Sequence, residues 1–568
     1  MNMRSRPGLM ILSLIFLGLS PAMAQESEPA EELQQEPMYE VDAVFAGYNN
    51  QESPGCALGV IRDGEFVYRR GYGMANLELD VPISPQSVFR IASTSKQFTA
   101  MAIALLAERE KLALDDTLKE YYPSYPAWAD DVTISQLVHH TSGVRDYLTL
   151  AYLAGRGDDQ DYYTTDWVIK LLGRQRETNF PPGTQYLYSN SGYLLLGQIV
   201  EQVSGMTLKE FSQQNMFGPL SMEHTHFHDD HTHIVPQRAS GYAPTEDGYR
   251  VSETTLDIVG DGSIYTSVDD LLLWDRNFYE NRLGAGDLTL IKQVTTPGTL
   301  ANGEAIDYAF GLTKDEYRGH TLISHGGAFV GFRAEMIRFP ELRFSVAVLC
   351  NRSDAAPSTL ARKVADHFLA DALDPLPEET LQHEPVELDE GRLHKYAGDF
   401  WEPKRAFAAE SRVEDGKLWA VHSPERRNEL VPIGEHRFQM IGMPLDTVVE
   451  YEMSDQGVAS VNLYMEGEAR GSFTPFTRRQ ANAEDLAEYR GDYFSPELDV
   501  EYLIRVSGDH LLLQIKDEQV RDLTPMFDDT FENPDLGAFE FLRGPEGGIA
   551  AFKLQSGRVR NLVFYRKP

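Results

Sequence analysis

Positively charged residues are scarce in this sequence. Its 568 residues include 51 Lys and Arg against 87 Asp and Glu, which gives a formal net charge of −36 at pH 7. A charge of this sign and size argues against nucleic acid or an anionic membrane surface as a partner, because both would be repelled. It favours neutral or cationic small molecules, although only weakly.

Long apolar runs are also missing after the first 24 residues. Residues 1–24 combine Arg4 and Arg6 with the apolar stretch GLMILSLIFLGL, and Ala-Met-Ala precedes Gln25. This stretch is short for a bilayer span and is typical of a cleaved secretory signal. No cysteine follows the expected cut, which argues against a lipid anchor there. We therefore expect an exported protein, periplasmic or secreted, without a membrane span.

Cysteine is nearly absent, since the chain has only Cys56 and Cys350. Both lie in strand-like apolar runs, PGCALGVI and FSVAVLCN. An oxidising compartment would allow them to pair. The sequence alone does not bring them together, so we expect two buried thiols and keep the disulfide as the alternative.

The chain is longer than one hydrophobic core usually serves, and its pattern of mixed helices and strands changes near residue 375. An acidic, Pro-containing linker, DPLPEETLQHEPVELDEG, is followed by short β-like runs. These runs repeat: LHKYAGDF (393–400) returns as LAEYRGDY (486–493), with Tyr396 and Tyr489 93 residues apart. We therefore predict a signal peptide at 1–24, a first domain at 25–376, and two small all-β barrels at 385–480 and 484–568.

The first domain shows strands at both ends and helices between them. A hairpin is expected around Asp63 and Gly64, and a helix follows Ser93. A short helix should end at Gly143. Three strands are expected in 321–351, before an amphipathic helix at 357–373. This order predicts an α+β domain in which one sheet is assembled from both ends of the chain segment.

Ser93 and Lys96 form the first chemical motif, S-x-x-K, at the start of an apolar helix. Residues three apart on a helix share a face, so the hydroxyl and the amine should lie side by side. Burial favours a neutral lysine, which can accept the hydroxyl proton and make the serine nucleophilic. The alternative is a surface lysine whose chain covers apolar residues.

Two further motifs follow in chain order. Tyr188 and Asn190 form Y-x-N on a loop between Pro-Gly and a helix, and His325 begins H-G-G on an expected strand. Each motif is weak by itself. The order and spacing of Ser93, Tyr188 and His325 indicate a nucleophilic site more strongly than any single motif.

Residues 40–375 resemble a known family through five segments: FRIASTSKQFTA, LVHHTSG, PGTQYLYSNSGYLLLG, GDGSIYTSVDDLLLW and ISHGGAFVGF. They resemble penicillin-recognising serine hydrolases, and more narrowly the group of class C β-lactamases, D-Ala-D-Ala carboxypeptidases and D-aminopeptidases. The resemblance implies a β-lactamase-like fold, an antiparallel sheet flanked by helices with a helical subdomain. The overall plan, with two lipocalin-like barrels behind this domain, is similar to that of bacterial D-aminopeptidase.

The resemblance also implies roles for the motif residues. Ser93 would be the acylated nucleophile, Lys96 its base, and Tyr188 the relay for the leaving-group proton. The backbone N–H groups of Ser93 and Ala328 would form an oxyanion hole. The remaining substrate-binding positions would be Asn190, His325, Gly326 and Gly327. No cofactor or metal is implied.

One departure from the family pattern concerns substrate charge. His325 stands where the class A relatives have the lysine of K-T-G, and histidine is mostly neutral at pH 7. A weaker grip on a carboxylate favours an amine-bearing substrate, as in an aminopeptidase. An esterase, a β-lactamase or D,D-carboxypeptidase, and a slow penicillin-binding sensor remain alternatives. We also expect a barrel loop to overhang the cleft, and an oligomer is possible.

The segment HTHFHDDHTH (224–233) holds five histidines and two aspartates. Such side chains could bind zinc or nickel. The segment resembles a surface loop, and we expect its alternating residues to point to both sides of an extended chain. We therefore predict no functional metal site there.

Overall fold

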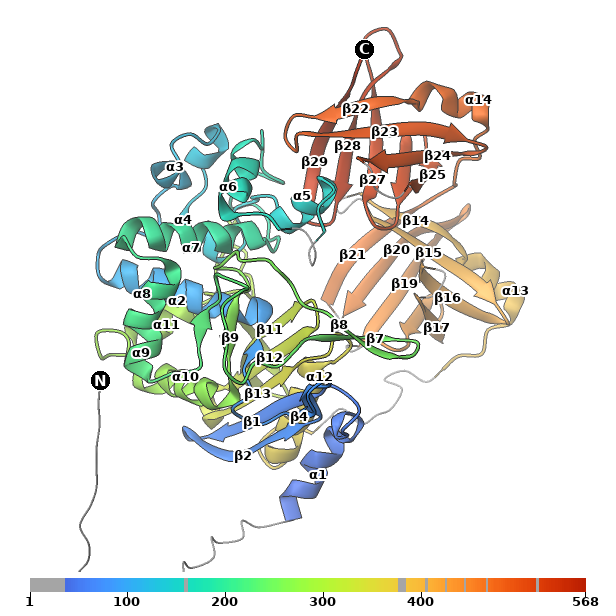
Figure 1. Ribbon diagram of the computed structural model, residues 1–568. Helices are drawn as coiled ribbons and strands as arrows, with labels where there is room; N and C mark the ends of the chain where they lie inside the picture. Colours follow the sequence, from blue (N-terminus) through green and yellow to red (C-terminus); the bar gives the residue numbers. More distant parts are fainter. Residues whose placement is uncertain are drawn as a thin grey trace, which may run out of the picture.

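The computed structural model describes residues 36–157, 162–375, 385–403, 407–423, 426–443, 446–465, 468–516 and 520–568. The predicted signal peptide, 1–24, lies outside these residues. Within them, no helix is both long enough and apolar enough to cross a bilayer. Figure 1 shows a mixed domain with two barrels stacked beside it.

A six-stranded antiparallel sheet organises the first domain in the order β10-β11-β12-β13-β1-β2. The prediction that both ends of the domain build one sheet is therefore confirmed, with β10 as an additional edge strand. The D-G turn between β1 and β2 has φ of 52° at Asp63 and 78° at Gly64, as a two-residue hairpin requires. The strands are β1 (Cys56–Arg62), β2 (Glu65–Tyr72), β10 (Thr313–Tyr317), β11 (His320–Phe329), β12 (Phe332–Phe339) and β13 (Phe344–Cys350).

Cys56 and Cys350 form a disulfide, so the expectation of two separate thiols is wrong. The two cysteines are direct partners in the antiparallel register of β1 and β13. The chain brings them together across 294 residues, and local sequence patterns contain no information about this strand pairing.

Helices cover both faces of the sheet. On one face, α1 (Glu36–Val44) and α12 (Pro357–Phe368) enclose a separate apolar core. On the other face lie α10 (Val268–Glu280) and α2 (Lys96–Glu108). Residues 96–106 of α2 are all buried, which is typical of a central helix surrounded by protein. The N-terminal end of α2 lies beside β11.

A helical region stands between the strands of the sheet in sequence. The predicted helix ending at Gly143 is shorter than expected, because α4 stops at Val138 and His140 takes a left-handed φ of 58°, which a helix cannot continue through. The remaining α-helices in the described part of the first domain are α3 (Leu118–Tyr121), α4 (Ile134–Val138), α5 (Tyr147–Leu153), α6 (Thr165–Gly173), α7 (Asn190–Ser204), α8 (Leu208–Ser212), α9 (Gly218–Leu220) and α11 (Thr289–Val294). Two short helices, α13 (Glu390–Leu393) and α14 (Ala483–Leu486), precede the barrels. Short strands β3 (Met74–Asn76) to β9 (Ile264–Thr266) fill the connections.

The C-terminal part folds into two closed eight-stranded barrels, as predicted. Barrel 1 consists of β14 (Gly398–Glu402), β15 (Phe407–Glu414), β16 (Lys417–Ser423), β17 (Arg426–Gly434), β18 (Arg437–Met440), β19 (Thr447–Ser454), β20 (Gly457–Met465) and β21 (Glu468–Phe476). Barrel 2 consists of β22 (Gly491–Ser495), β23 (Val500–Ser507), β24 (His510–Ile515), β25 (Arg521–Phe527), β26 (Thr530–Asn533), β27 (Gly537–Arg543), β28 (Ile549–Ser556) and β29 (Val559–Arg566).

The sequence repeat has a structural counterpart in each barrel. Tyr396 and Tyr489 are both buried and pack edge-on against a barrel phenylalanine, Phe438 and Phe531 respectively. Pro432 and Pro525, which end the matching segments LVP (430–432) and LTP (523–525), also both lie where the strand register shifts at a bulge. A bulge tolerates proline because the ladder is already interrupted there.

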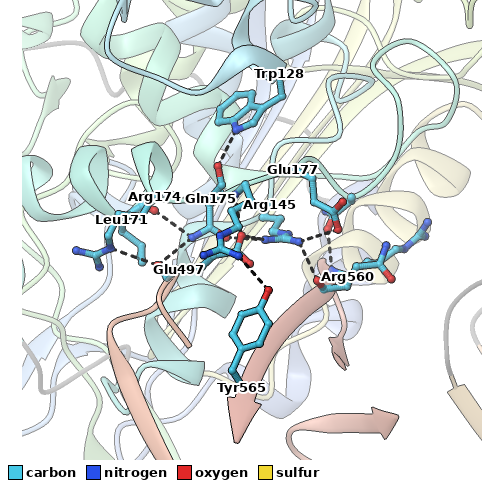
Figure 2. Close-up of polar contacts among 12 residues, drawn as sticks. Trp128, Arg145, Leu171, Arg174, Gln175, Glu177, Glu497, Arg560 and Tyr565 are labelled. Atoms are coloured by element: carbon cyan, nitrogen blue, oxygen red, sulfur yellow. Dashed lines mark hydrogen bonds and ion pairs between the residues drawn. The ribbon is translucent and has the colours of Figure 1, made fainter. Parts of the chain in front are cut away.

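Barrel 2 is docked firmly on the helical region of the first domain. Figure 1 shows it beside α5 and α6, and its apolar interior is continuous with the main core of the first domain. At the centre of the joint, Arg145 Nη1 and Glu497 Oε2 are 2.7 Å apart, with side chains 0% and 3% exposed (Figure 2). The Tyr502 hydroxyl also donates to the Leu153 carbonyl at the end of α5.

Candidate active site

Ser93 lies on a tight turn immediately before the central helix. A 3-10 turn, Ala92–Ser95, leads directly into α2, of which Lys96 is the first residue. Ala92 has φ of 46°, a conformation that is costly for a residue with a Cβ atom. Ser93 lines a cavity, whereas Lys96 is fully buried. Their hydroxyl and amine lie side by side, as the S-x-x-K spacing predicted.

Lys96 is fully buried, and its amine has three polar neighbours. Nζ lies 3.3 Å from Ser93 Oγ, 2.8 Å from Asn190 Oδ1 and 2.6 Å from the Asp261 carbonyl oxygen. Burial lowers the pKa of Lys96 to about 7, against the opposing effect of the Asp261 carboxylate. A neutral amine has two N–H donors and one lone pair. Because the two carbonyl oxygens only accept, the lone pair is available to the Ser93 hydroxyl.

Tyr188 faces the same amine from a loop held by His140. The Leu187 N–H donates to the His140 carbonyl, and the Ser189 N–H donates to His140 Nδ1. Lys96 Nζ lies 4.7 Å from the centre of the Tyr188 ring. Burial raises the pKa of Tyr188 well above its usual range, while the Ser93 hydroxyl and Arg558 act in the opposite direction. Among the described residues, the Tyr188 hydroxyl has no hydrogen-bond partner.

Asn190 begins α7 and connects the helix to the site. Its side-chain oxygen accepts from Lys96, and its backbone N–H donates to Asp146 Oδ2 over 2.7 Å. Asp146 also caps α5 by accepting from the Thr149 N–H. The sequence placed Asn190 on a loop, whereas the structure places it at the first helical position.

The H-G-G segment lies on β11, close against the serine turn. The Thr94 hydroxyl donates to the His325 carbonyl over 3.2 Å. A Cβ atom at Gly327 would lie 2.0 Å from the Ile91 carbonyl oxygen, so only glycine allows this approach. Ser93 and Ala328 consequently line the same cavity, as the predicted oxyanion hole requires, although its N–H pair stays a prediction.

His325 uses both ring nitrogens within the protein. Nδ1 lies 2.7 Å from the Gly326 carbonyl, which can only accept, so this nitrogen carries the proton. Nε2 therefore accepts from the Tyr308 hydroxyl over 2.9 Å. Burial, assisted by Lys96, lowers the pKa of His325 to about 4. The imidazole is neutral at pH 7, as expected.

These residues surround a cavity of about 800 Å³. Lys96 lies beneath it. The sequence-predicted residues in its wall are Ser93, Tyr188, Asn190, His325, Gly326, Gly327 and Ala328. The wall also contains Arg90, Tyr147, Asp261, Arg333 and Arg558, which sequence reasoning missed. Arg90 and Asp261 lie within the quoted segments FRIASTSKQFTA and GDGSIYTSVDDLLLW, where no role was assigned to them. Arg558 comes from barrel 2, so no local signal could have found it.

The histidine-rich segment lies elsewhere and differs from expectation. His226 Nε2 and His228 Nδ1 are 3.2 Å apart, and both rings lie near His233. Residues two apart in an extended chain share a face, so the expectation of opposite sides is wrong for this pair. Within the described part of the chain, one group of potential metal ligands has atoms within 4.8 Å of one another, namely Asp230, His231 and Asp257.

The geometry around Ser93 suits acyl transfer. A buried, neutral lysine can take the serine proton, a buried tyrosine can pass a proton onward, and backbone N–H groups can stabilise an oxyanion. The cavity is large enough for a short peptide or a comparable small molecule.

The profile of the Beta-lactamase family matches residues 41–370, more than half of the chain. This protein therefore belongs to the Beta-lactamase family, and it is a serine hydrolase of the D-aminopeptidase and penicillin-binding protein type.

Similarity to one of the relatives extends beyond this domain. Penicillin-binding protein 4* of Bacillus subtilis is 29% identical over 425 residues, covering 71% of this chain and 91% of the relative. D-aminopeptidase of Gluconobacter oxydans is 31% identical over 313 residues, covering 55% of this chain and 58% of the relative. The match thus spans little more than half the length of that D-aminopeptidase.

Solved structures support the fold. The octameric penicillin-binding protein homologue from Pyrococcus abyssi has a TM-score of 0.53 at 23% identity, covering 77% of this chain and 98% of that one. The penicillin-binding protein from Bacillus halodurans has a TM-score of 0.50 at 25% identity, covering 60% of this chain and 99% of that one. D-amino acid amidase from Ochrobactrum anthropi has a TM-score of 0.50 at 20% identity, covering 59% of this chain and 98% of that one.

Proposed function

We propose that this protein hydrolyses an amide or ester bond through an acyl-enzyme on Ser93, as a D-aminopeptidase-like peptidase. The observation that carries the proposal is the buried Lys96 amine, 3.3 Å from Ser93 Oγ and beside acceptor-only carbonyls. A lysine serving only to cover apolar surface would keep its charge in water. A fully buried amine with a pKa of about 7 is suited to proton transfer at neutral pH.

In the first half-reaction, Lys96 takes the proton from Ser93 Oγ while the oxygen attacks the substrate carbonyl carbon. The carbonyl oxygen becomes negative and is stabilised by the N–H groups of Ser93 and Ala328. Collapse of this intermediate breaks the bond to the leaving group, which receives a proton through Tyr188. Water then attacks the carbonyl carbon of the acyl-serine. The bond to Ser93 Oγ breaks and this oxygen regains a proton, which releases the acid and restores Ser93.

The proposal also includes the localisation of the protein. We propose export to the periplasm or the medium, supported by the signal-like segment 1–24 and by the Cys56–Cys350 disulfide. Disulfides persist in oxidising compartments and are rare in the cytosol. The D-aminopeptidase-like substrate class is supported by the relatives of that name. An esterase or a β-lactamase-like activity is the alternative within the same chemistry.

Covalent labelling tests the proposal most directly. A fluorophosphonate probe should modify Ser93, and Ser93→Ala should abolish the label. Ser358 offers a matched control, because it also lines the cavity but donates to Glu335. Ser358→Ala should therefore keep the label.

Turnover is then measured on D-amino acid amides, short D-peptides, short-chain esters and nitrocefin. Hydrolysis of the amides or peptides that is lost in Ser93→Ala would support the peptidase. Hydrolysis of esters alone would favour the esterase alternative. A labelled protein that turns over none of these substrates would be a slow penicillin-binding sensor, and the proposal would be wrong.

A further inference from the structure

The hairpin that joins the last two strands of barrel 2 reaches the active-site cavity. Ser556 and Val559 pair across its two-residue turn, formed by Gly557 with φ of 52° and Arg558. Glycine at the first position suits a tight turn of this kind. Arg558 is therefore at the tip, and its side chain lines the same cavity as Ser93. The expectation that a barrel loop overhangs the cleft is confirmed.

The first domain holds this tip in place through backbone contacts. The Arg558 carbonyl accepts from Asn179 Nδ2 over 2.9 Å and from the Asp146 N–H over 3.4 Å. The Arg560 N–H donates to Asn179 Oδ1 over 2.7 Å. The buried pair in Figure 2, Arg145 with Glu497, fixes the rest of the barrel. The position of Arg558 is thus determined by contacts of the hairpin tip with the first domain and by the docking of barrel 2 as a whole.

The guanidinium of Arg558 is directed at the reacting groups. It lies 4.7 Å from the centre of the Tyr188 ring and 3.8 Å from Asp146 Oδ2. Asp146 is engaged already, because its oxygens accept from the N–H groups of Asn190 and Thr149. Within the described residues Arg558 donates no side-chain hydrogen bond, and 43% of its side chain is exposed. Its fork of donors therefore remains available on the cavity side.

The charge of the cavity is opposite to that of the whole chain. Its lining includes three arginines, Arg90, Arg333 and Arg558, and one carboxylate, Asp261. Asp261 is 6% exposed and accepts from the Tyr147 hydroxyl. His325, at the position of the relatives' cationic lysine, has both nitrogens engaged within the protein. Local fixed charges govern binding more than the distant surface does, because solvent screens the latter.

We infer that Arg558 is a specificity-determining residue, supplied by barrel 2, that binds an anionic group, in particular a carboxylate, on the substrate of Ser93. The inference rests on the proposed acyl-enzyme function. A guanidinium binds a carboxylate through two parallel hydrogen bonds, which an exposed arginine fork beside Tyr188 can form. The preference for an amine-bearing substrate, drawn from the neutral His325 and from the acidic charge of the whole chain, would then be reversed by the cavity itself.

Two matched pairs of esters test this. The first pair is the mono-p-nitrophenyl ester of glutaric acid and that of glutaramic acid, which differ in a carboxylate or carboxamide on the acyl side. The second pair is the acetates of 3-hydroxybenzoic acid and 3-hydroxybenzamide, which differ on the leaving group. A carboxylate held by Arg558 should give a higher kcat/KM for the anionic member of at least one pair.

Arg558→Gln should lower kcat/KM for the preferred anionic ester by about 10- to 100-fold, the effect of one hydrogen bond to a charged group. It should change the neutral ester by no more than about twofold. Arg558→Lys should recover part of the loss, since it keeps the charge without the fork. Arg560→Gln, on the same hairpin but outside the cavity lining, is the control and should leave both esters unchanged.

Equal losses on both members of each pair, or no preference for the anion in the unmodified protein, would overturn the inference. If no ester is turned over, labelling rates with alkyl fluorophosphonates bearing a terminal carboxylate or carboxamide give the same comparison. Failure of any probe to label Ser93 would instead overturn the proposed function. An intact label without anion selectivity would overturn only the role of Arg558.

Discussion

Replacing Lys96 by methionine tests the central electrostatic claim, that burial lowers the pKa of the amine to about 7, so that it is mainly neutral above pH 7. Methionine has a similar length and no charge. The pKa of Lys96 falls from 10.5 to about 7 on burial, a difference of about 3.5 units, or about 5 kcal/mol. This is the cost of keeping the amine in the folded protein at pH values below 7. Lys96→Met removes that cost and also stops catalysis.

The sign of the pH dependence follows from proton binding. Between about pH 7 and 10.5, Lys96 is protonated in the unfolded chain and neutral in the folded one, so the unfolded state binds more protons. The free energy of unfolding of the unmodified protein should therefore rise with pH, by about 1.4 kcal/mol per unit from this group. Lys96→Met lacks this contribution. The variant also leaves Asn190 Oδ1 and the Asp261 carbonyl without a partner, a penalty that does not vary with pH.

The assay is urea denaturation of both proteins at about pH 7.5 and 9.5. The difference in unfolding free energy should change by about 2.7 kcal/mol in favour of the unmodified protein at the higher pH. Ser93→Ala keeps the lysine and is the matched control, so it should follow the unmodified protein. In parallel, kcat/KM should rise with pH with an apparent pKa near 7. A difference that stays constant with pH would mean that Lys96 is charged in the folded state, and the assignment of the base would be refuted.

Two further perturbations test the joints of the fold. Glu497→Gln should destabilise the protein by about 3–5 kcal/mol, because Arg145 would lose its buried anionic partner. The double variant Arg145→Met/Glu497→Leu should be more stable than Glu497→Gln, as measured by calorimetry. An unchanged melting temperature of Glu497→Gln would contradict this expectation. Reduction of the Cys56–Cys350 disulfide, or Cys56→Ser/Cys350→Ser, should cost about 2–4 kcal/mol. The double variant should be insensitive to reductant in thermal melts, and two titratable thiols in the unreduced native protein would disprove the pairing.

Local features of the sequence were sufficient to predict most of the architecture. Strand alternation, the D-G turn and the apolar helix behind Ser93 depend on contacts between near neighbours, which a short stretch of chain already specifies. The two barrels could be predicted because the repeat of Tyr396 at Tyr489 conserves turns and strands in register. The S-x-x-K spacing predicted that the Ser93 hydroxyl and the Lys96 amine lie side by side for the same reason, since three residues span almost one helical turn.

Only the tertiary structure decided which distant groups meet and how well water is excluded from them. The pairing of Cys56 with Cys350 depends on the register of two strands 294 residues apart. The protonation of Lys96 and His325 depends on burial by several separate elements, and desolvation is a property of the assembled surroundings. Arg558 reaches the cavity of Ser93 only because barrel 2 docks on the helical region. The amino-acid composition determined an acidic chain, whereas the fold determined a cavity whose charged lining residues are three arginines and one aspartate, because packing selects which few charges lie within reach of the substrate.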